Sequence, residues 1–136
     1  MNRCAPLCRR AVLAAGLALA LLGAALPAAA QVTRHFPMNA LRGELTVLSA
    51  TEVLLNGDLA RLAPGARLRG QNNMLVVSGA AIGQRLVVNY TVDSLGNVKD
   101  VWVLRDEEIA NRPWPRTLQE AQTWGFNFDA QIWVKP

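Results

Sequence analysis

The sequence is poor in the residues that carry most nucleophilic and metal-binding chemistry. It contains two cysteines, Cys4 and Cys8, and one histidine, His35. Both cysteines fall in an N-terminal segment that we expect to be removed, which leaves no disulfide, no thiol nucleophile and no cysteine ligand for a metal. A single histidine supplies neither a complete metal site nor a proton relay. We therefore expect no metal and no other cofactor.

Motifs of the common enzyme classes are also missing. No glycine-rich run precedes a helical pattern, which excludes the usual phosphate-binding loops. None of Ser49, Ser78 and Ser94 has the glycine-flanked setting of an activated serine. The acidic run 106–108 fits the first turn of a helix, where carboxylates interact favourably with the helix dipole. We predict a protein without catalytic activity.

The long apolar run lies at the N-terminus. Three arginines in residues 1–10 precede an unbroken apolar run over residues 11–26, and small residues follow it. This pattern is typical of a secretory signal peptide, and the spacing of small residues predicts cleavage after Ala30. The run is shorter than the roughly 20 residues of a membrane span. We expect an exported, periplasmic protein with no membrane span after cleavage; Arg9 and Arg10 leave the export route open.

The excess of positive charge depends largely on that segment. The full chain carries 14 basic and 10 acidic residues. Three of the basic residues lie in residues 1–30, so 11 remain against 10 acidic ones. A chain so close to neutral lacks the concentrated positive charge that nucleic-acid binding requires. The 106 residues that follow the predicted cleavage site suit a single domain stabilised by core packing.

Three segments are expected along the chain: a signal peptide over residues 1–30, an N-terminal arm over 31–42 and one β-rich domain over 43–136. The arm shows no clean periodicity and contains Pro37. From residue 43 onward, short alternating runs predict strands, and in residues 44–50 Leu45 and Val47 share the apolar face.

Turn signals separate these runs at close intervals. Asn56 and Gly57 lie between two apolar runs, which is the strongest short hairpin signal. Pro64 and Gly65 predict another turn, followed by an apolar run at 74–79. A second hairpin over 86–104 has a turn in which Asp93 accepts backbone hydrogen bonds and Gly96 adopts a left-handed conformation. This spacing predicts six or seven antiparallel strands in a small barrel or sandwich.

The C-terminal part changes character. Residues 106–111 predict one helical turn, and Thr117 with Glu120 three residues later predicts the start of a short C-terminal helix that ends before Gly125. A helix of about two turns is unstable alone, so its apolar face is expected to pack on the barrel. Residues 126–134 predict a closing strand or an extended tail.

Aromatic residues are few, and five of the eight lie in residues 113–133. Three of them, Trp124, Phe126 and Trp133, are expected in the core of so small a domain. Trp114 lies between two prolines and is the aromatic residue that we expect to be exposed. Since arginine and tryptophan are enriched at binding hot spots, the candidate ligand contacts are Trp114, Arg67, Arg69 and Arg85.

Two resemblances follow from the β-rich part. The run from LLNGDL to VWVL, residues 54–104, resembles a group of small exported bacterial proteins without assigned function. That resemblance implies no activity and no site residues. The hairpin 86–104, with the run VVNYTVDSLGNVKDVWVL, is similar to the hairpin of TonB C-terminal domains, which contact outer-membrane receptors.

These observations favour a non-enzymatic binding module of the bacterial cell envelope, with an envelope protein or polymer as its partner. The ligand and the oligomeric state stay open. The alternative is a hydrolase that acts on an envelope polymer, which two acids and an arginine converging in a cleft would favour. An apolar patch around Trp114 would favour the binding module. A long unpaired edge strand would favour a third possibility, a structural accessory subunit.

Overall fold

Eight strands and three short helices make up residues 32–136, the part of the chain that our computed structural model describes. The strands are β1 (Leu41–Val47), β2 (Glu52–Leu55), β3 (Asp58–Arg69), β4 (Leu75–Val76), β5 (Arg85–Val92), β6 (Val98–Val103), β7 (Gly125–Asn127) and β8 (Ile132–Val134). The helices are the 3-10 helix η1 (Ser78–Ala81), α2 (Asp106–Ala110) and α3 (Leu118–Thr123). The predicted signal peptide, residues 1–30, lies outside the described residues.

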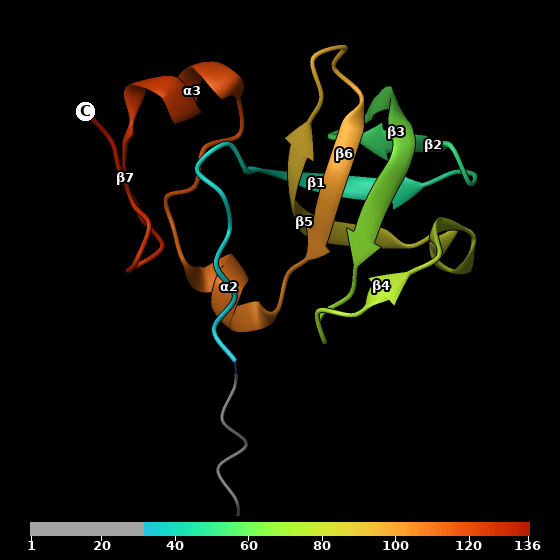
Figure 1. Cartoon of the computed structure of the whole chain (residues 1–136), viewed down its shortest axis with the longest axis horizontal. Helices are drawn as coiled ribbons and strands as arrows, with labels where there is room; N and C mark the ends of the chain where they lie inside the picture. Colours follow the sequence, from blue (N-terminus) through green and yellow to red (C-terminus); the bar gives the residue numbers. More distant parts are fainter. Residues whose placement is uncertain (1–31) are drawn as a thin grey trace, which may run out of the picture. The chain divides into compact units, whose positions relative to one another are not determined.

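Five strands close into a barrel, which confirms the mainly β prediction (Figure 1). Around the barrel the order is β1, β5, β6, β3 and β2, and β2 pairs with β1 again. Four of these contacts are antiparallel, whereas β3 and β6 run parallel. The prediction of antiparallel strands alone is therefore wrong at one position, because the β5–β6 hairpin inserts β6 beside β3. A closed five-stranded barrel by itself assigns no ligand.

The two predicted hairpins are present. Asn56 and Gly57 have φ angles of 54° and 89°, as the tight turn between β2 and β3 requires. Between β5 and β6, the Asp93 carboxylate accepts hydrogen bonds from the backbone N–H groups of Leu95 and Asn97 at 2.9 and 2.8 Å. Gly96 has a φ of 83°. Both turns are specified within a few residues, which is why the sequence predicts them correctly.

The turn predicted at Pro64 and Gly65 is wrong, because β3 continues through both residues. Gly65 does have a positive φ, 76°, but the register against β6 shifts between Leu62 and Arg67. Such a bulge bends a strand without ending it. The bend lets β3 pair with β2 in its first half and with β6 in its second half.

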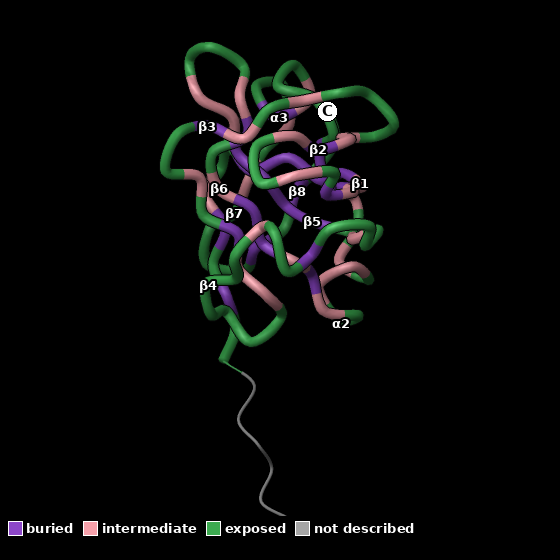
Figure 2. The backbone as a smooth tube through the Cα atoms, turned by 90° about the vertical axis from the view of Figure 1, so that its right-hand side faces the viewer, coloured by how far each residue is buried: buried purple, intermediate pink, exposed green. Residues whose placement is uncertain are grey.

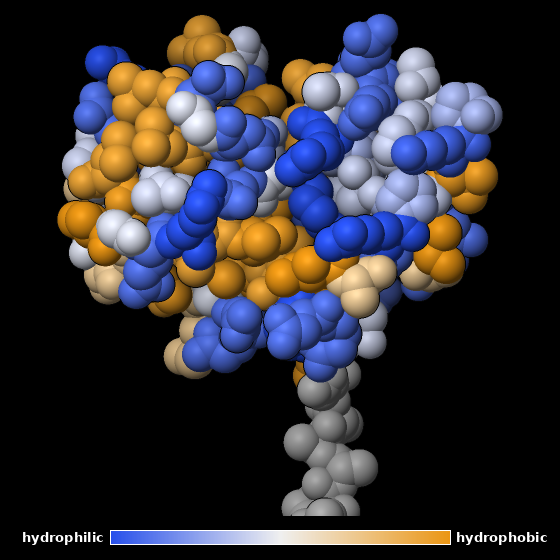
Figure 3. Space-filling view, turned by 180° about the vertical axis from the view of Figure 1, so that it is seen from behind, coloured by the Kyte–Doolittle hydropathy of each residue, from blue (hydrophilic) through white to orange (hydrophobic). Residues whose placement is uncertain are grey.

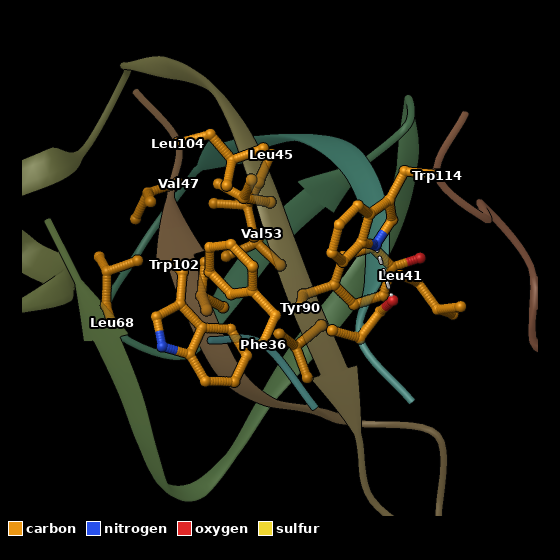
Figure 4. Close-up of a cluster of buried hydrophobic side chains, with 14 of the residues drawn as sticks. Phe36, Leu41, Leu45, Val47, Val53, Leu68, Tyr90, Trp102, Leu104 and Trp114 are labelled. Atoms are coloured by element: carbon orange, nitrogen blue, oxygen red, sulfur yellow. Dashed lines mark hydrogen bonds between the residues drawn. The ribbon is translucent and has the colours of Figure 1, made fainter. Parts of the chain in front are cut away.

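Both faces of the sheet around β5 are buried. Val88 and Tyr90 point to one face and Asn89 and Thr91 to the other, yet all four are buried. The buried stretches run through the middle of the molecule, with exposed loops around them (Figure 2). Within the barrel, the core contains Leu45 as predicted (Figure 4). The outer face must therefore be covered by segments outside the barrel.

One covering segment is the N-terminal one, which is not a loose arm. Arg34 and Phe36 are buried, at 7% and 3% exposure, and β1 begins at Leu41 within the predicted arm. The Phe36 ring meets the Trp102 ring edge to face, with centroids 5.7 Å apart. The sequence conceals this docking because only two alternating side chains carry it, too few to produce a periodic pattern.

The C-terminal residues supply the rest of the cover. Helices α2 and α3 form near the predicted positions, and the Thr117 hydroxyl accepts a hydrogen bond from the backbone N–H of Glu120 at 3.2 Å. The helix face is only partly buried, because Leu118 is exposed while Ala121 packs in the core. Residues 126–134 do not form one closing strand. Instead, β7 and β8 pair with each other as a separate two-stranded sheet.

Candidate functional site

Trp114 is not the exposed contact that its proline neighbours predict. Its side chain is 6% exposed, and its indole N–H donates to the carbonyl oxygen of Ala40 at 3.0 Å, the dashed line in Figure 4. The proline-flanked loop is held against β1, because the backbone N–H of Arg42 donates to the carbonyl of Pro115 at 2.8 Å. The Arg42 guanidinium lies over the indole ring, 4.8 Å from its centroid. Trp114 is therefore buried because its loop packs against β1, although the loop sequence shows no apolar periodicity that would predict this.

The aromatic residues of 113–133 mainly form a core. Trp133 is buried, as predicted, and its ring stacks on that of Phe126 with centroids 4.5 Å apart. Trp124 and Phe126 are half-buried and pack against the core. Phe128 is exposed. The segment thus closes the outer face of the barrel and leaves three rings, those of Trp124, Phe126 and Phe128, partly in contact with solvent.

The predicted arginines do not gather around Trp114. Arg67 and Arg69 lie on β3, where the guanidinium of Arg67 is 3.9 Å from the Asp100 carboxylate. Arg85 begins β5 and forms an exposed ion pair with Glu44. Because β6 separates β3 from β5, the structure does not join these residues into one site.

A groove of about 750 Å³ lies between the barrel and the C-terminal segment. Its barrel side comes from β1 and β5, and its other sides come from residues 109–116, α3 and the C-terminal strand end. The lining residues are Arg42, Gly43, Glu44, Val87, Ile109, Arg112, Pro113, Trp114, Arg116, Glu120, Trp124 and Lys135. They combine apolar surface with charged side chains, a combination that is also visible on the face of the molecule in Figure 3.

Arg42 places a buried cation at the base of this groove. Its guanidinium donates to the Asn89 side-chain oxygen and to backbone carbonyls of Glu108 and Asn111, at 2.7 to 3.1 Å. No carboxylate of residues 32–136 forms an ion pair with it. Burial and the nearby charge of Arg112 lower its pKa to about 10, against an opposing effect of Glu108. Arg42 remains charged at neutral pH, and neutral oxygens together with the Trp114 ring hold it.

Three further cations lie at the rim. Among the described residues, the Arg116 side chain has no hydrogen bond or ion pair, and Arg112 makes one long hydrogen bond to a backbone carbonyl, at 3.4 Å. The Lys135 ammonium lies 5.1 Å from the ring centroid of Trp124. These three cations lack carboxylate partners in the described part of the chain.

The two carboxylates of the groove are already engaged. Glu44 pairs with Arg85, and Glu120 accepts a hydrogen bond from the backbone N–H of Arg116 at 2.7 Å. Four cationic and two anionic side chains line the groove, so it carries an excess of two positive charges. Residues 32–136 carry 11 basic and 10 acidic residues, and this groove concentrates positive charge within them.

Sequence reasoning missed the rim of this groove. Arg112 and Arg116 lie about 70 positions after Arg42, and Lys135 lies further on. The alternation of side chains in β1 places Arg42 and Glu44 on one face of the strand. This alternation is the one feature of the sequence that indicates part of the groove. Nothing in the sequence pattern indicates which C-terminal residues fold back against that face.

Comparison with protein-family models, with curated proteins and with solved structures finds no match to this chain. The two resemblances of the β-rich region therefore stay predictions. Within residues 32–136, no group of three or more His, Cys, Asp or Glu side chains is arranged to hold a metal ion. No helix in this range is long and apolar enough to cross a membrane.

Proposed function

We propose that this chain is a non-enzymatic binding module of the bacterial cell envelope, exported to the periplasm, and that the groove beside β1 is its ligand site. One observation carries the proposal: cations without carboxylate partners line a hollow that also presents apolar and aromatic surface. Ligand sites are commonly hollows of about 300 to 1,000 Å³ with a few charged groups that fix orientation. The proposed partner is an envelope protein or polymer.

The alternative, hydrolysis of an envelope polymer, has one feature in its favour. Glu44 and Glu120 line the groove together with Arg42, which is the combination of two acids and an arginine that hydrolysis would use. Both carboxylates, however, already accept hydrogen bonds or ion pairs from neighbouring residues. A polymer-degrading activity that Glu120→Gln abolishes would assign the groove to hydrolysis instead of binding.

The binding proposal is tested by site-specific photo-crosslinking in cells that produce the exported protein. A photoreactive residue replaces Val87, which lines the groove at 36% exposure, and in the matched control it replaces Leu95, which is 83% exposed in the β5–β6 turn. We expect a discrete adduct from position 87, absent from position 95 and reduced by Arg116→Gln. Equal labelling at both positions, or no adduct at position 87, would contradict the proposal, as would retention of the chain in the cytoplasm.

A further inference from the structure

We infer that the groove recognises a carboxylate carried on an apolar body, as at the C-terminal residue of a peptide. This inference rests on the proposed function, since it assumes that the groove binds a ligand. It adds the chemical class of that ligand, which the charges and the apolar lining together define.

The charge of the rim indicates an anion. Arg116 and Arg112 present guanidinium groups with most of their donors unused, and Lys135 adds an ammonium group on the same hollow. Beneath them, the buried charge of Arg42 has no ion-pair partner among the described residues. Positive charge at a partly enclosed site attracts an anion more strongly than the same charge on an open surface, because water screens it less.

The remaining lining residues favour a carboxylate over a phosphate. Glu44 and Glu120 bring two negative charges to the same groove, which limits the positive excess to two. A phosphate ester, which carries between one and two negative charges near neutral pH, would meet stronger repulsion from them than a carboxylate would. A planar guanidinium forms a two-point hydrogen-bonded pair with either anion, so the preference for a carboxylate rests on the two glutamates.

The apolar lining accounts for the rest of the ligand. Val87, Ile109 and Pro113 lie on the groove with the half-buried ring of Trp124. Such surface holds an aliphatic or aromatic side chain next to the carboxylate. Trp114 contributes little contact area because it is buried, so the predicted role of this tryptophan passes to Trp124.

The test measures binding of defined small probes to the purified exported protein by calorimetry and by the indole N–H resonance of Trp124, assigned with Trp124→Phe. The probes are N-acetylphenylalanine, its neutral amide and phenyl phosphate. We expect saturable binding of the acid that weakens at high salt, and none of the amide at the same concentration. Arg112→Gln and Arg116→Gln should each weaken binding about fivefold. Arg61→Gln, on the exposed face of β3 outside the groove, is the matched control and should change nothing.

Two sources of this carboxylate are separated by a second pair of probes. A short peptide that ends in phenylalanine is compared with N-acetylphenylalanine; tighter binding of the peptide supports a peptide terminus, and equal binding supports a free organic acid. Equal binding of the amide, tighter binding of phenyl phosphate, or an effect of Arg61→Gln as large as that of Arg116→Gln overturns the inference. If no probe binds while the cross-link from position 87 forms, the ligand class is rejected and the binding module stands.

Discussion

Arg34 and Glu108 join two segments that are 74 positions apart in the chain. The Arg34 guanidinium forms an ion pair with the Glu108 carboxylate and also donates to the carbonyls of Gly70 and Val103, at 3.0 and 2.7 Å. Burial by itself raises the pKa of Glu108, but hydrogen bonds from the Arg34 side chain and the Arg105 backbone outweigh it. The pKa of Glu108 therefore lies below its usual value.

A lowered carboxylate pKa makes the stability depend on pH in a defined direction. The contribution of Glu108 is present above its unfolded pKa, near 4.5, and is lost as the pH falls through the lower folded pKa. We expect Glu108→Gln to be less stable than the wild type at pH 7, and the difference between the two proteins to shrink below about pH 4.5. Denaturant unfolding between pH 2.5 and 7 measures this. Asp93, whose pKa is also lowered, is present in both proteins and cancels in the subtraction. A difference that stays constant over this range would contradict the prediction.

Trp114 carries a second prediction at the same scale. Trp114→Phe removes the hydrogen bond to the Ala40 carbonyl and part of a buried ring, so we expect a loss of about 2 kcal/mol in the free energy of unfolding. Trp114 is buried, whereas Trp124 is half-buried. We therefore expect acrylamide to quench the tryptophan fluorescence of Trp124→Phe clearly less than that of the wild type, and that of Trp114→Phe about as much as that of the wild type. A readily quenched component that disappears with Trp114 would show that its side chain is exposed after all.

At the scale of the elements, the sequence predicts what a few neighbouring residues decide. The Asn56–Gly57 turn, the Asp93 turn and the Thr117 helix start are each defined by local hydrogen bonds or φ angles, and all three are found. Pro64 and Gly65 predict a turn where the structure has a bulge, because a turn and a bulge use the same left-handed glycine. The difference is made by β6, a partner strand more than 30 residues away.

The bulge at Gly65 is testable by a matched pair of glycine substitutions. In Gly65→Ala the new side chain has open space around it, but the φ of 76° strains any residue with a Cβ. We expect a loss of about 1 kcal/mol in the free energy of unfolding. Gly79→Ala, which also meets open space and has no positive φ, should change the stability much less. Urea unfolding of both variants measures these losses. Equal losses for Gly65→Ala and Gly79→Ala would contradict the claim that the left-handed conformation of Gly65 matters for stability.

The candidate site was not predictable at this scale. Arg42 comes from β1, Arg112 from the loop after α2, and Lys135 from the residue after β8. They meet because the C-terminal segment folds back over the barrel. Aromatic side chains hold the segment there, and their irregular spacing in the sequence gives no periodic pattern that would predict it. The arginines singled out from the sequence, Arg67 and Arg85, are on the barrel itself, where strand patterns were readable.

At the scale of the whole molecule, two segments outside the barrel pack on its outer face and shield it from water. The N-terminal segment and the C-terminal residues both pack on the outer face of β1, β5 and β6, as the edge-to-face contacts of Phe36 with Trp102 and with Trp114 show. The C-terminal segment of 113–136 supplies most of the aromatic rings. Without it, the Phe36 ring would lose its contact with Trp114, and part of the outer face of the sheet would be in water.

Deletion of residues 113–136 tests this dependence. We expect the truncated protein to lose cooperative unfolding and to bind an apolar dye such as ANS, because packed side chains of the outer face become exposed. Deletion of Lys135 and Pro136 alone, both exposed, is the control and should leave the melting temperature nearly unchanged. A truncated protein that unfolds as cooperatively as the control would show that the barrel core is sufficient.

The parallel contact between β3 and β6 also bears on how the chain is assembled. A ribosome delivers β1, β2 and β3 first, yet the barrel closes only when β6 is available. The C-terminal part of the cover, which includes Trp114, comes later still, since it follows α2 in the chain. During synthesis the growing polypeptide therefore passes through a stage in which the five barrel strands are complete and the C-terminal part of their cover is still missing. That interval is when the nascent chain depends most on chaperones that prevent aggregation.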